Sequence, residues 1–453
     1  MTRTSPSWVP DAVFYQIFPD RFRRHRGPWP AAGSGATREL CGGDLVGVRD
    51  ALPYLEDLGV NALYLTPIFA AASYHRYDTL DYYAVDPLLG GDKALSDLVA
   101  ALHARRMRIV LDGVFNHASD QHPFFSDAVR RGPQSEYWNW FSIHGEAVST
   151  IPEPNYDCWA GVPSMPEWNQ RNPEVREYLL SVVRHWIRKF GIDGWRLDTT
   201  EYLPPDVVRA IDAATKEANP DAYVLGEVMG LGTPWFRHNA LDGIMHYKLW
   251  ERLVAFIAEE KWDAERLASS LHSIWRSYTE SGNYNSMTLL GSHDKPRFLT
   301  LCGGDKRKLL LATAFLFTFP GAPAIYYGDE IGLEGGEDPD NRRCFPWDET
   351  AWDRDLLAAV RSLVELRHRL PALRRGSLAL ASAEGRVITF RRELPNERIL
   401  VALNADRERA ASVPLGTEGR YVDAFTGRPL PATASVPPLG YCIAIDRAAT
   451  ASA

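Results

Sequence analysis

The chain has 453 residues, of which 45% are hydrophobic and 24% are charged, and its formal net charge at pH 7 is −8. These proportions are typical of a globular protein, and a chain of this length can form more than one domain. The negative charge, with only the short basic run RFRRHR at 21–26, excludes a nucleic-acid-binding protein. No stretch is long and apolar enough to predict a membrane span.

The cysteines and the N-terminal sequence indicate the cellular compartment of the protein. The five cysteines form no CxxC pair: Cys41, Cys158, Cys302, Cys344 and Cys442. We therefore expect free thiols in a reducing compartment, and no zinc site or redox motif. The first residues, MTRTSPSWVPDAVFYQ, lack the apolar core and small-residue cleavage site of a secretory signal. Together these features predict a cytoplasmic protein.

Short apolar segments alternate with amphipathic helical patterns over the first 330 residues. Strands are predicted in eight segments: 12–19, 61–68, 107–115, 192–198, 222–228, 241–249, 286–294 and 321–330. Helical spacing of apolar residues, as in 94–106 and 175–191, lies between most of them. Eight βα units in about 360 residues predict the α/β class and a (β/α)₈ TIM barrel, since open doubly wound sheets usually have fewer strands.

Two parts of the chain depart from this repeat. Residues 117–173 are rich in Trp, Pro, Tyr and Asn and lack helical periodicity, so they predict a small subdomain inserted after the third barrel strand. The surrounding barrel, the catalytic domain, is expected over residues 1–370. Residues 371–453 alternate apolar and polar positions between turns, which predicts a C-terminal antiparallel β-sandwich domain.

Charged and polar side chains stand at the C-terminal ends of four predicted barrel strands. In chain order they are Asp112, Asn116 and His117, then Arg196 and Asp198, then Glu227, and finally His293 and Asp294. These strand ends form the rim on which the catalytic residues of such barrels lie. A single carboxylate after a strand is more often a helix cap. Four strand ends with unpaired charges would be costly, so the set predicts a functional site.

The segment GWRLD (194–198) indicates the chemistry of this site. Residues two apart on a strand point to the same side, so Arg196 and Asp198 project together. Retaining glycoside hydrolysis needs one ionised and one protonated carboxyl group. An arginine lowers the pKa of an adjacent carboxyl, whereas an apolar environment such as AYVLG before Glu227 raises it. We interpret Asp198 as a nucleophile kept ionised by Arg196, and Glu227 as the acid.

Four segments resemble the short conserved regions of the α-amylase family of glycoside hydrolases: DGVFNH (112–117), GWRLDTTEY (194–202), GEV (226–228) and LLGSHD (289–294). MPEWN (165–169) resembles the fifth region of that family. AVFYQIFPDRF, the segment at 42–69 and YDTLDYYAVDP are most similar to its neopullulanase, cyclomaltodextrinase and maltogenic amylase branch. The likeness covers about residues 8–445. It implies retaining hydrolysis of α-1,4-glucosidic bonds in malto-oligosaccharides or related α-glucans, with transglycosylation left open.

The resemblance also implies roles for ten residues. The catalytic set is Asp198 as nucleophile, Glu227 as general acid/base and Asp294 as a third acid that binds sugar hydroxyls. The substrate-binding set is Tyr77, Asp112, His117, Arg196, His293, Asp338 and Arg342. Tyr77 is expected to stack on the sugar at the cleavage point, and the pair Asp338 and Arg342 to contact the next sugar toward the non-reducing end.

Departures from the family pattern modify these expectations. Starch-hydrolysing members often have Lys-His where this chain has Glu201 and Tyr202, and that His commonly joins the first-region Asn at a calcium ion. We therefore expect no cofactor and no calcium at Asn116. Met229 stands where the cyclodextrin-active branch often has Trp, and Glu167 and Trp168 where it usually has Lys-Leu. The N-terminal β domain that builds the dimer of that branch is not in this sequence, so the oligomeric state stays open, with a monomer favoured.

Aromatic residues and alternative functions complete the predictions. Five aromatics in the insertion are candidates for the wall of a sugar cleft: Trp138, Trp140, Tyr156, Trp159 and Trp168. One alternative function is a transferring or isomerising family member, such as a trehalose-forming enzyme, a glucanotransferase or a sucrose-cleaving enzyme. Another is an inactive barrel that binds glycans, although such chains usually lose a catalytic carboxylate.

Overall fold

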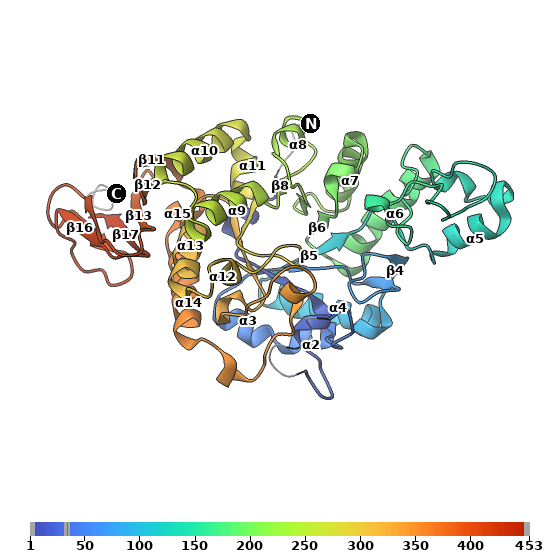
Figure 1. The fold of residues 1–453 in the computed structure, drawn as a ribbon, viewed down its shortest axis with the longest axis horizontal. Helices are drawn as coiled ribbons and strands as arrows, with labels where there is room; N and C mark the ends of the chain where they lie inside the picture. The colour runs from blue at the N-terminus through green and yellow to red at the C-terminus, as the bar shows by residue number, and fades with distance from the viewer. Residues whose placement is uncertain (1–4, 31–33, 35–36, 448–453) are drawn as a thin grey trace.

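The computed structural model describes residues 5–30, 34 and 37–447. Its centre is an eight-stranded parallel sheet in the order β8-β7-β6-β5-β2-β1-β10-β9 (Figure 1). The strands are β1 (Phe14–Ile17), β2 (Ala62–Leu65), β5 (Arg108–Gly113), β6 (Gly194–Leu197), β7 (Tyr223–Gly226), β8 (Gly243–Ile244), β9 (Met287–Leu289) and β10 (Ala322–Tyr326). A parallel bridge between Met245 and Met287 joins the two outer strands. The predicted (β/α)₈ barrel is confirmed, and each strand lies within its predicted segment.

Alternate residues of these strands face two different cores. Phe14, Tyr64 and Leu225 belong to one buried cluster, which fills the barrel. Their neighbours in sequence belong to a second cluster, which includes the surrounding helices. On β6, Trp195 packs outward, with its ring centroid 5.4 Å from that of Phe115. Arg196 therefore points inward, as the two-residue period predicts.

Helices cover the barrel between consecutive strands. The longer ones are α4 (Gly91–Ala104), α6 (Pro173–Phe190), α7 (Pro205–Ala218), α10 (Ala264–Ser277), α13 (Lys306–Thr318) and α14 (Arg354–Arg369). The segment between β1 and β2 contains two shorter helices, α2 (Leu45–Asp50) and α3 (Leu52–Leu58). Local sequence explains the ends of α6: Asn172 caps the first turn, Pro173 opens it, and Gly191 closes it in the left-handed conformation.

The sixth predicted strand is shorter than its segment. Only Gly243–Ile244 pairs with β7, because the chain turns into α9 (Tyr247–Leu253) directly afterwards. The side chain of His246 caps this helix by accepting a hydrogen bond from the Leu249 amide. Apolar residues at the start of a helix and at the end of a strand look alike in sequence, which explains the overestimate.

Two excursions leave the barrel between β2 and β6. The first is an antiparallel hairpin of β3 (Phe69–Ala71) and β4 (Thr79–Val85), which the sequence did not predict. The second lies between β5 and β6 and contains α5 (Pro123–Arg131), three short 3₁₀ helices and isolated bridges such as His117–Glu167. This second excursion projects from one end of the molecule in Figure 1, opposite the C-terminal sheet.

After α14 and the short helix α15 (Pro371–Arg375) the chain forms antiparallel sheets. The strands are β11 (Ser377–Glu384), β12 (Val387–Leu394), β13 (Glu397–Asn404), β14 (Ala411–Pro414), β15 (Tyr421–Asp423), β16 (Thr433–Val436) and β17 (Gly440–Asp446). Five of them form the sheet β11-β12-β13-β17-β15, and β14 pairs with β16. The predicted C-terminal antiparallel domain is confirmed.

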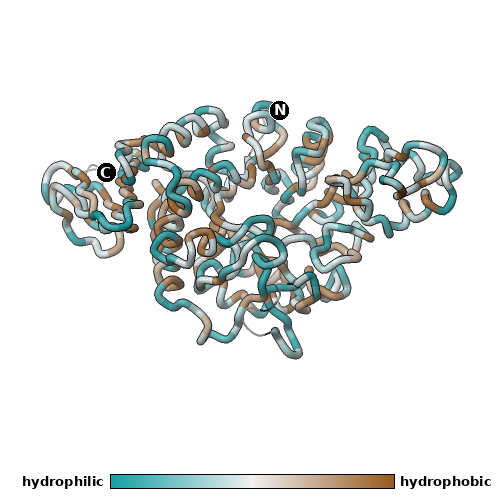
Figure 2. The backbone as a smooth tube through the Cα atoms, viewed as in Figure 1, coloured by the Kyte–Doolittle hydropathy of each residue, from teal (hydrophilic) through white to brown (hydrophobic). Residues whose placement is uncertain are grey.

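The five-stranded sheet packs on the apolar helix α13, along which the tube in Figure 2 is largely hydrophobic. The Phe390 ring lies 5.8 Å from Phe315 and 6.1 Å from Phe319, centroid to centroid. Beside it, the fully buried Arg392 donates hydrogen bonds to the main-chain carbonyls of Thr318 (2.7 Å) and Leu373 (2.8 Å). Strand β12 is thus bonded to the chain that enters β10.

The expectation of five free thiols is wrong for one pair. Cys41 and Cys344 form a disulfide between the segment after β1 and the segment after β10, 303 residues apart in sequence. The ends of the barrel chain meet because β1 pairs with β10. Sequence spacing gives no sign of this proximity. Cys158, Cys302 and Cys442 are free.

Candidate active site

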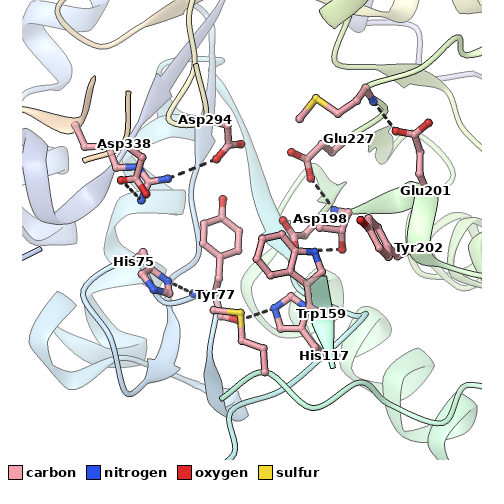
Figure 3. Close-up of a pocket in the computed structure, with 14 residues that line it drawn as sticks. His75, Tyr77, His117, Trp159, Asp198, Glu201, Tyr202, Glu227, Asp294 and Asp338 are labelled. Atoms are coloured by element: carbon pink, nitrogen blue, oxygen red, sulfur yellow. Dashed lines mark hydrogen bonds and ion pairs between the residues drawn. The ribbon is translucent and has the colours of Figure 1, made fainter. Parts of the chain in front are cut away.

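A cavity of about 420 Å³ opens at the C-terminal ends of the barrel strands. Its size is typical of a site for a small ligand. It is lined by His75, Tyr77, His117, Trp159, Met165, Asp198, Thr199, Glu201, Tyr202, Glu227, Met229, Asp294, Asp338 and Arg342 (Figure 3). Seven of the ten residues singled out in the sequence are in this set. The other three, Asp112, Arg196 and His293, lie buried in direct contact with it.

Arg196 is the centre of the charged cluster. Its Nη1 donates hydrogen bonds to Asp112 Oδ1 and Asp198 Oδ1, both at 2.8 Å. Its Nη2 lies 2.9 Å from Glu227 Oε1 and 3.8 Å from Asp294 Oδ2, but makes no hydrogen bond of good geometry with either. One fully buried guanidinium thus faces four carboxyl groups. The charge-assisted bond from Arg196 Nη1 stabilises the ionised form of Asp198.

The carboxyl pKa values in the cluster reflect burial as well as charge. Burial raises the pKa of Glu227, the Arg196 charge lowers it, and Asp294 raises it further, with a net upward shift. Burial raises the pKa of Asp112 to about 6 despite Arg196. Burial also raises the pKa of Asp198, and the charges of Glu227 and Asp112 add to this effect. Arg196 lowers the pKa of Asp198, as expected, but the net shift is well upward.

Tyr77, from the β3–β4 hairpin, and His293 form the floor beside this cluster. The Tyr77 hydroxyl donates to Asp112 Oδ2 at 2.9 Å and is hydrogen-bonded to His293 Nε2. Gln16 Nε2 donates to His293 Nδ1 at 2.7 Å, so the ring proton is on Nε2. Burial and then the charges of Arg196 and Arg342 lower the pKa of His293 well below its usual value. His293 is therefore a neutral donor at the base of the cavity.

His117 borders the cavity from the start of the insertion. Its Nε2 lies 3.1 Å from the Tyr77 carbonyl, and burial lowers its pKa to about 4. Asn116, the family's frequent calcium ligand, instead donates to Glu167 Oε1 at 3.1 Å. Within the described ranges, no group of three or more His, Cys, Asp or Glu side chains is arranged to hold a metal ion.

Asp338 lies at one end of the cavity (Figure 3), and Arg342, its ion-pair partner, also lines the cavity. Arg342 Nη1 is 3.0 Å from Asp338 Oδ1, and its Nη2 is 3.5 Å from Asp294 Oδ1. The Tyr74 hydroxyl accepts a hydrogen bond from Arg342 Nη1 at 3.1 Å. The pair predicted to contact the next sugar is therefore directly continuous with the carboxylate cluster.

Glu201 and Tyr202 lie on the side of the cavity away from Asp338 (Figure 3), and Met229 also lines the cavity. Tyr202 exposes 59% of its surface, an unusually large fraction for an aromatic residue beside a cavity. In the sequence, these three residues stand out only as departures from a family pattern. Thr199 and His75 were not predicted, although both adjoin motif residues and could have been found from that adjacency.

The prediction for the aromatic residues of the insertion is largely wrong. Of the five candidates, only Trp159 lines the cavity, with its ring 5.9 Å from that of His117. Trp168 is buried, stacks on Phe141 at 4.9 Å and donates to the Tyr82 hydroxyl. The remaining three, Trp138, Trp140 and Tyr156, do not line the cavity. An insertion this poor in aliphatic residues uses its aromatic rings to build its own core.

Comparison with known proteins decides the family. Residues 16–362 match the family description "Alpha amylase, catalytic domain". The chain belongs to the α-amylase family. It is a glycoside hydrolase of that family, in line with the resemblance found in the sequence.

Relatives of this α-amylase family chain include a cyclomaltodextrinase from Geobacillus thermopakistaniensis, 41% identical over 97% of this chain and 77% of the relative. The intracellular maltogenic amylase of Bacillus subtilis strain 168 is 40% identical, over 95% of this chain and 75% of its own length. A solved structure of cyclic α-maltosyl-(1→6)-maltose hydrolase from Arthrobacter globiformis, in complex with its cyclic sugar, superposes with a TM-score of 0.91. It is 38% identical and covers 98% of this chain and 100% of its own.

Proposed function

We propose that the chain hydrolyses α-1,4-glucosidic bonds of short malto-oligosaccharides, linear or cyclic, by a retaining double displacement. The observation that carries this proposal is the contact of Asp198 and Glu227 with the same guanidinium at the wall of the cavity. Two carboxyl groups of unequal hydrogen bonding to one cation suit a nucleophile and an acid. The printed activities of the relatives, on cyclomaltodextrins and on a cyclic maltosyl-maltose, support the substrate class.

In the first step, Asp198 attacks the anomeric carbon with Oδ2, the oxygen that Arg196 does not hold. Glu227 gives its proton to the glycosidic oxygen as the bond to the leaving sugar breaks, and a glycosyl ester of Asp198 forms. In the second step, Glu227 takes a proton from water, which attacks the anomeric carbon and releases Asp198. We assign sugar-hydroxyl binding to Asp294, His117 and His293.

The stereochemistry of the product tests this mechanism. Because two inversions restore the original configuration, the first product of maltotriose hydrolysis is expected to be the α-anomer. Proton NMR during the first minutes, before mutarotation, distinguishes the two anomers. A β-anomer as the first product would rule out the proposed double displacement. Parallel time courses on β-cyclodextrin and pullulan define the preferred substrate.

Transfer to a sugar acceptor is a second candidate, favoured by one observation. The exposed ring of Tyr202 lies at the leaving-group end, where it offers a stacking surface to a second sugar. A sugar bound there would compete with water for the glycosyl ester. Products longer than the starting maltotriose would reveal transfer.

We propose that the enzyme needs no metal ion. Calcium prefers six to eight oxygen ligands. Here Tyr202 replaces a common ligand residue, Asn116 is engaged with Glu167, and arginines in 21–26 disfavour a cation near β1. We expect a chelator to leave the melting temperature unchanged. A fall of more than a few degrees that added calcium reverses would show that a metal stabilises the fold.

We propose a cytoplasmic location, which the printed name of the intracellular amylase from Bacillus subtilis supports. No helix in the described part of the chain combines the length and the apolarity that a membrane crossing requires.

A further inference from the structure

Hydrogen bonds run in both directions between the turn that follows β6 and the turn that follows β7. In one direction, the Thr199 amide donates to Glu227 Oε2 at 2.7 Å. In the other, the Glu201 carboxylate, labelled in Figure 3, accepts from the Met229 amide at 2.8 Å. It also accepts from the Gly230 amide at 3.3 Å. Each turn therefore supplies a carboxylate to the main chain of the other.

Local conformation in both turns accommodates this exchange. Thr199 has φ 43° and ψ 45°, a left-handed conformation that β-branched residues rarely adopt, and its amide points at Glu227 as a result. At Gly230, an added Cβ would lie 2.8 Å from Glu201 Oε1, so glycine leaves room for the carboxylate. A strained residue at an active site persists when the surrounding contacts hold it.

We propose that Glu201 is a positioning residue for the general acid. Through the amides of Met229 and Gly230, it fixes the turn that begins at Glu227 and so keeps the acid carboxyl aimed into the cavity. Glu201 is exposed, and an exposed hydrogen bond of this kind adds little to stability. Its effect is expected on the reaction, because a small displacement of a catalytic group lowers the rate by about 10²-fold. This inference rests on the proposed role of Glu227.

The need for an acid depends on the leaving group, which gives the inference a specific signature. A departing sugar alkoxide must be protonated, whereas a 2,4-dinitrophenolate leaves without help. Displacement of the Glu227 carboxyl therefore slows the cleavage of maltotriose but leaves the cleavage rate of 2,4-dinitrophenyl α-maltoside nearly unchanged. A general loss of structure slows both. The comparison uses kcat/KM, which reports the first irreversible step.

The experiment compares Glu201→Ala and Glu201→Gln with the parent. The matched control is Glu265→Ala, because the Glu265 carboxylate also accepts from a distant amide, that of Gly385, at 3.1 Å, and does not line the cavity. For Glu201→Ala we expect kcat/KM on maltotriose to fall about 10- to 100-fold. On the aryl maltoside we expect less than about a threefold change. Glu201→Gln is expected to recover part of the loss, because its amide oxygen still accepts, and Glu265→Ala to match the parent.

Unchanged maltotriose kinetics in Glu201→Ala, or equal losses on both substrates, would overturn the positioning role. Amide hydrogen exchange tests the contact between Glu201 and the turn after β7 without any turnover. Exchange in the segment 226–232 is expected to quicken in Glu201→Ala and not in Glu265→Ala, and unchanged exchange would also overturn it. If the unsubstituted enzyme cleaves neither substrate, the proposed function is contradicted instead. The amide hydrogen exchange result then decides only whether Glu201 holds the turn after β7.

Discussion

Replacing Asp198 by alanine is expected to lower kcat on malto-oligosaccharides by about 10⁴-fold or more, because the nucleophile that forms the covalent intermediate is lost. The fold should survive. Three buried carboxyl groups, Asp112, Asp198 and Glu227, share Arg196, and burial raises the pKa of each of them. Removing Asp198 removes its repulsion with Asp112 and Glu227, so the melting temperature should be unchanged or higher.

A small external nucleophile supplies the positive control for this variant. Azide fits the space left by the Asp198 carboxylate and should attack an activated aryl α-maltoside from that face. The product would be the β-maltosyl azide, formed with a single inversion. Turnover within tenfold of the parent, or azide products of α configuration, would contradict the assignment of Asp198 as nucleophile.

Replacing Arg196 by methionine is expected to abolish activity and to destabilise the fold. The variant leaves buried carboxyl groups without their cation, and removing one partner of a buried ion pair typically costs about 3–5 kcal/mol. Loss of the Arg196 charge raises the pKa of Asp198 further, which disfavours the ionised form that attacks. We expect kcat to fall by at least about 10³-fold.

The loss of stability in this variant should depend on pH with a definite sign. A carboxyl whose pKa is raised in the folded state binds more protons folded than unfolded, so stability falls as pH increases. The pKa of Asp112 is already about 6 with Arg196 present. The deficit in melting temperature should therefore be small near pH 5 and large at pH 8. Arg392→Met is the matched control, because the hydrogen bonds of that buried arginine go to carbonyls, which do not titrate. Equal deficits at both pH values for Arg196→Met would contradict the charge argument.

The sequence predicted the barrel and the residues at its rim because both depend on local, periodic signals. Because side chains alternate in direction along β6, Arg196 and Asp198 lie on the same side. The C-terminal ends of the strands in a parallel barrel converge regardless of the segments that connect them. The positions of Glu227 and Asp294 beside Arg196 follow from that geometry.

Features that depend on long-range packing were beyond sequence reasoning. The hairpin that carries Tyr77 has short strands with irregular register, and its position under His293 depends on tertiary contacts. The wrong assignment of Trp168 to the cleft arose because composition does not distinguish a stacking platform from a core ring. The upward pKa shift of Asp198 reflects burial and neighbouring carboxyl groups, whose combined effect exceeds that of the arginine.

The contact between the C-terminal sheet and α13 has a consequence for how the chain can be divided. Arg392 on β12 binds carbonyls on both sides of the change from α-helical to antiparallel architecture, and Phe390 packs against Phe315 of α13 and Phe319 directly after it. Arg367 on α14 binds the neighbouring carbonyls of Phe317 and Phe319. A cut between the two architectures would expose apolar rings and leave buried carbonyls without hydrogen-bond donors. These carbonyls lie just before β10, which pairs with β1. We therefore expect the two architectures on either side of residue 371 to unfold together, and the catalytic barrel not to fold once the C-terminal sheet is removed.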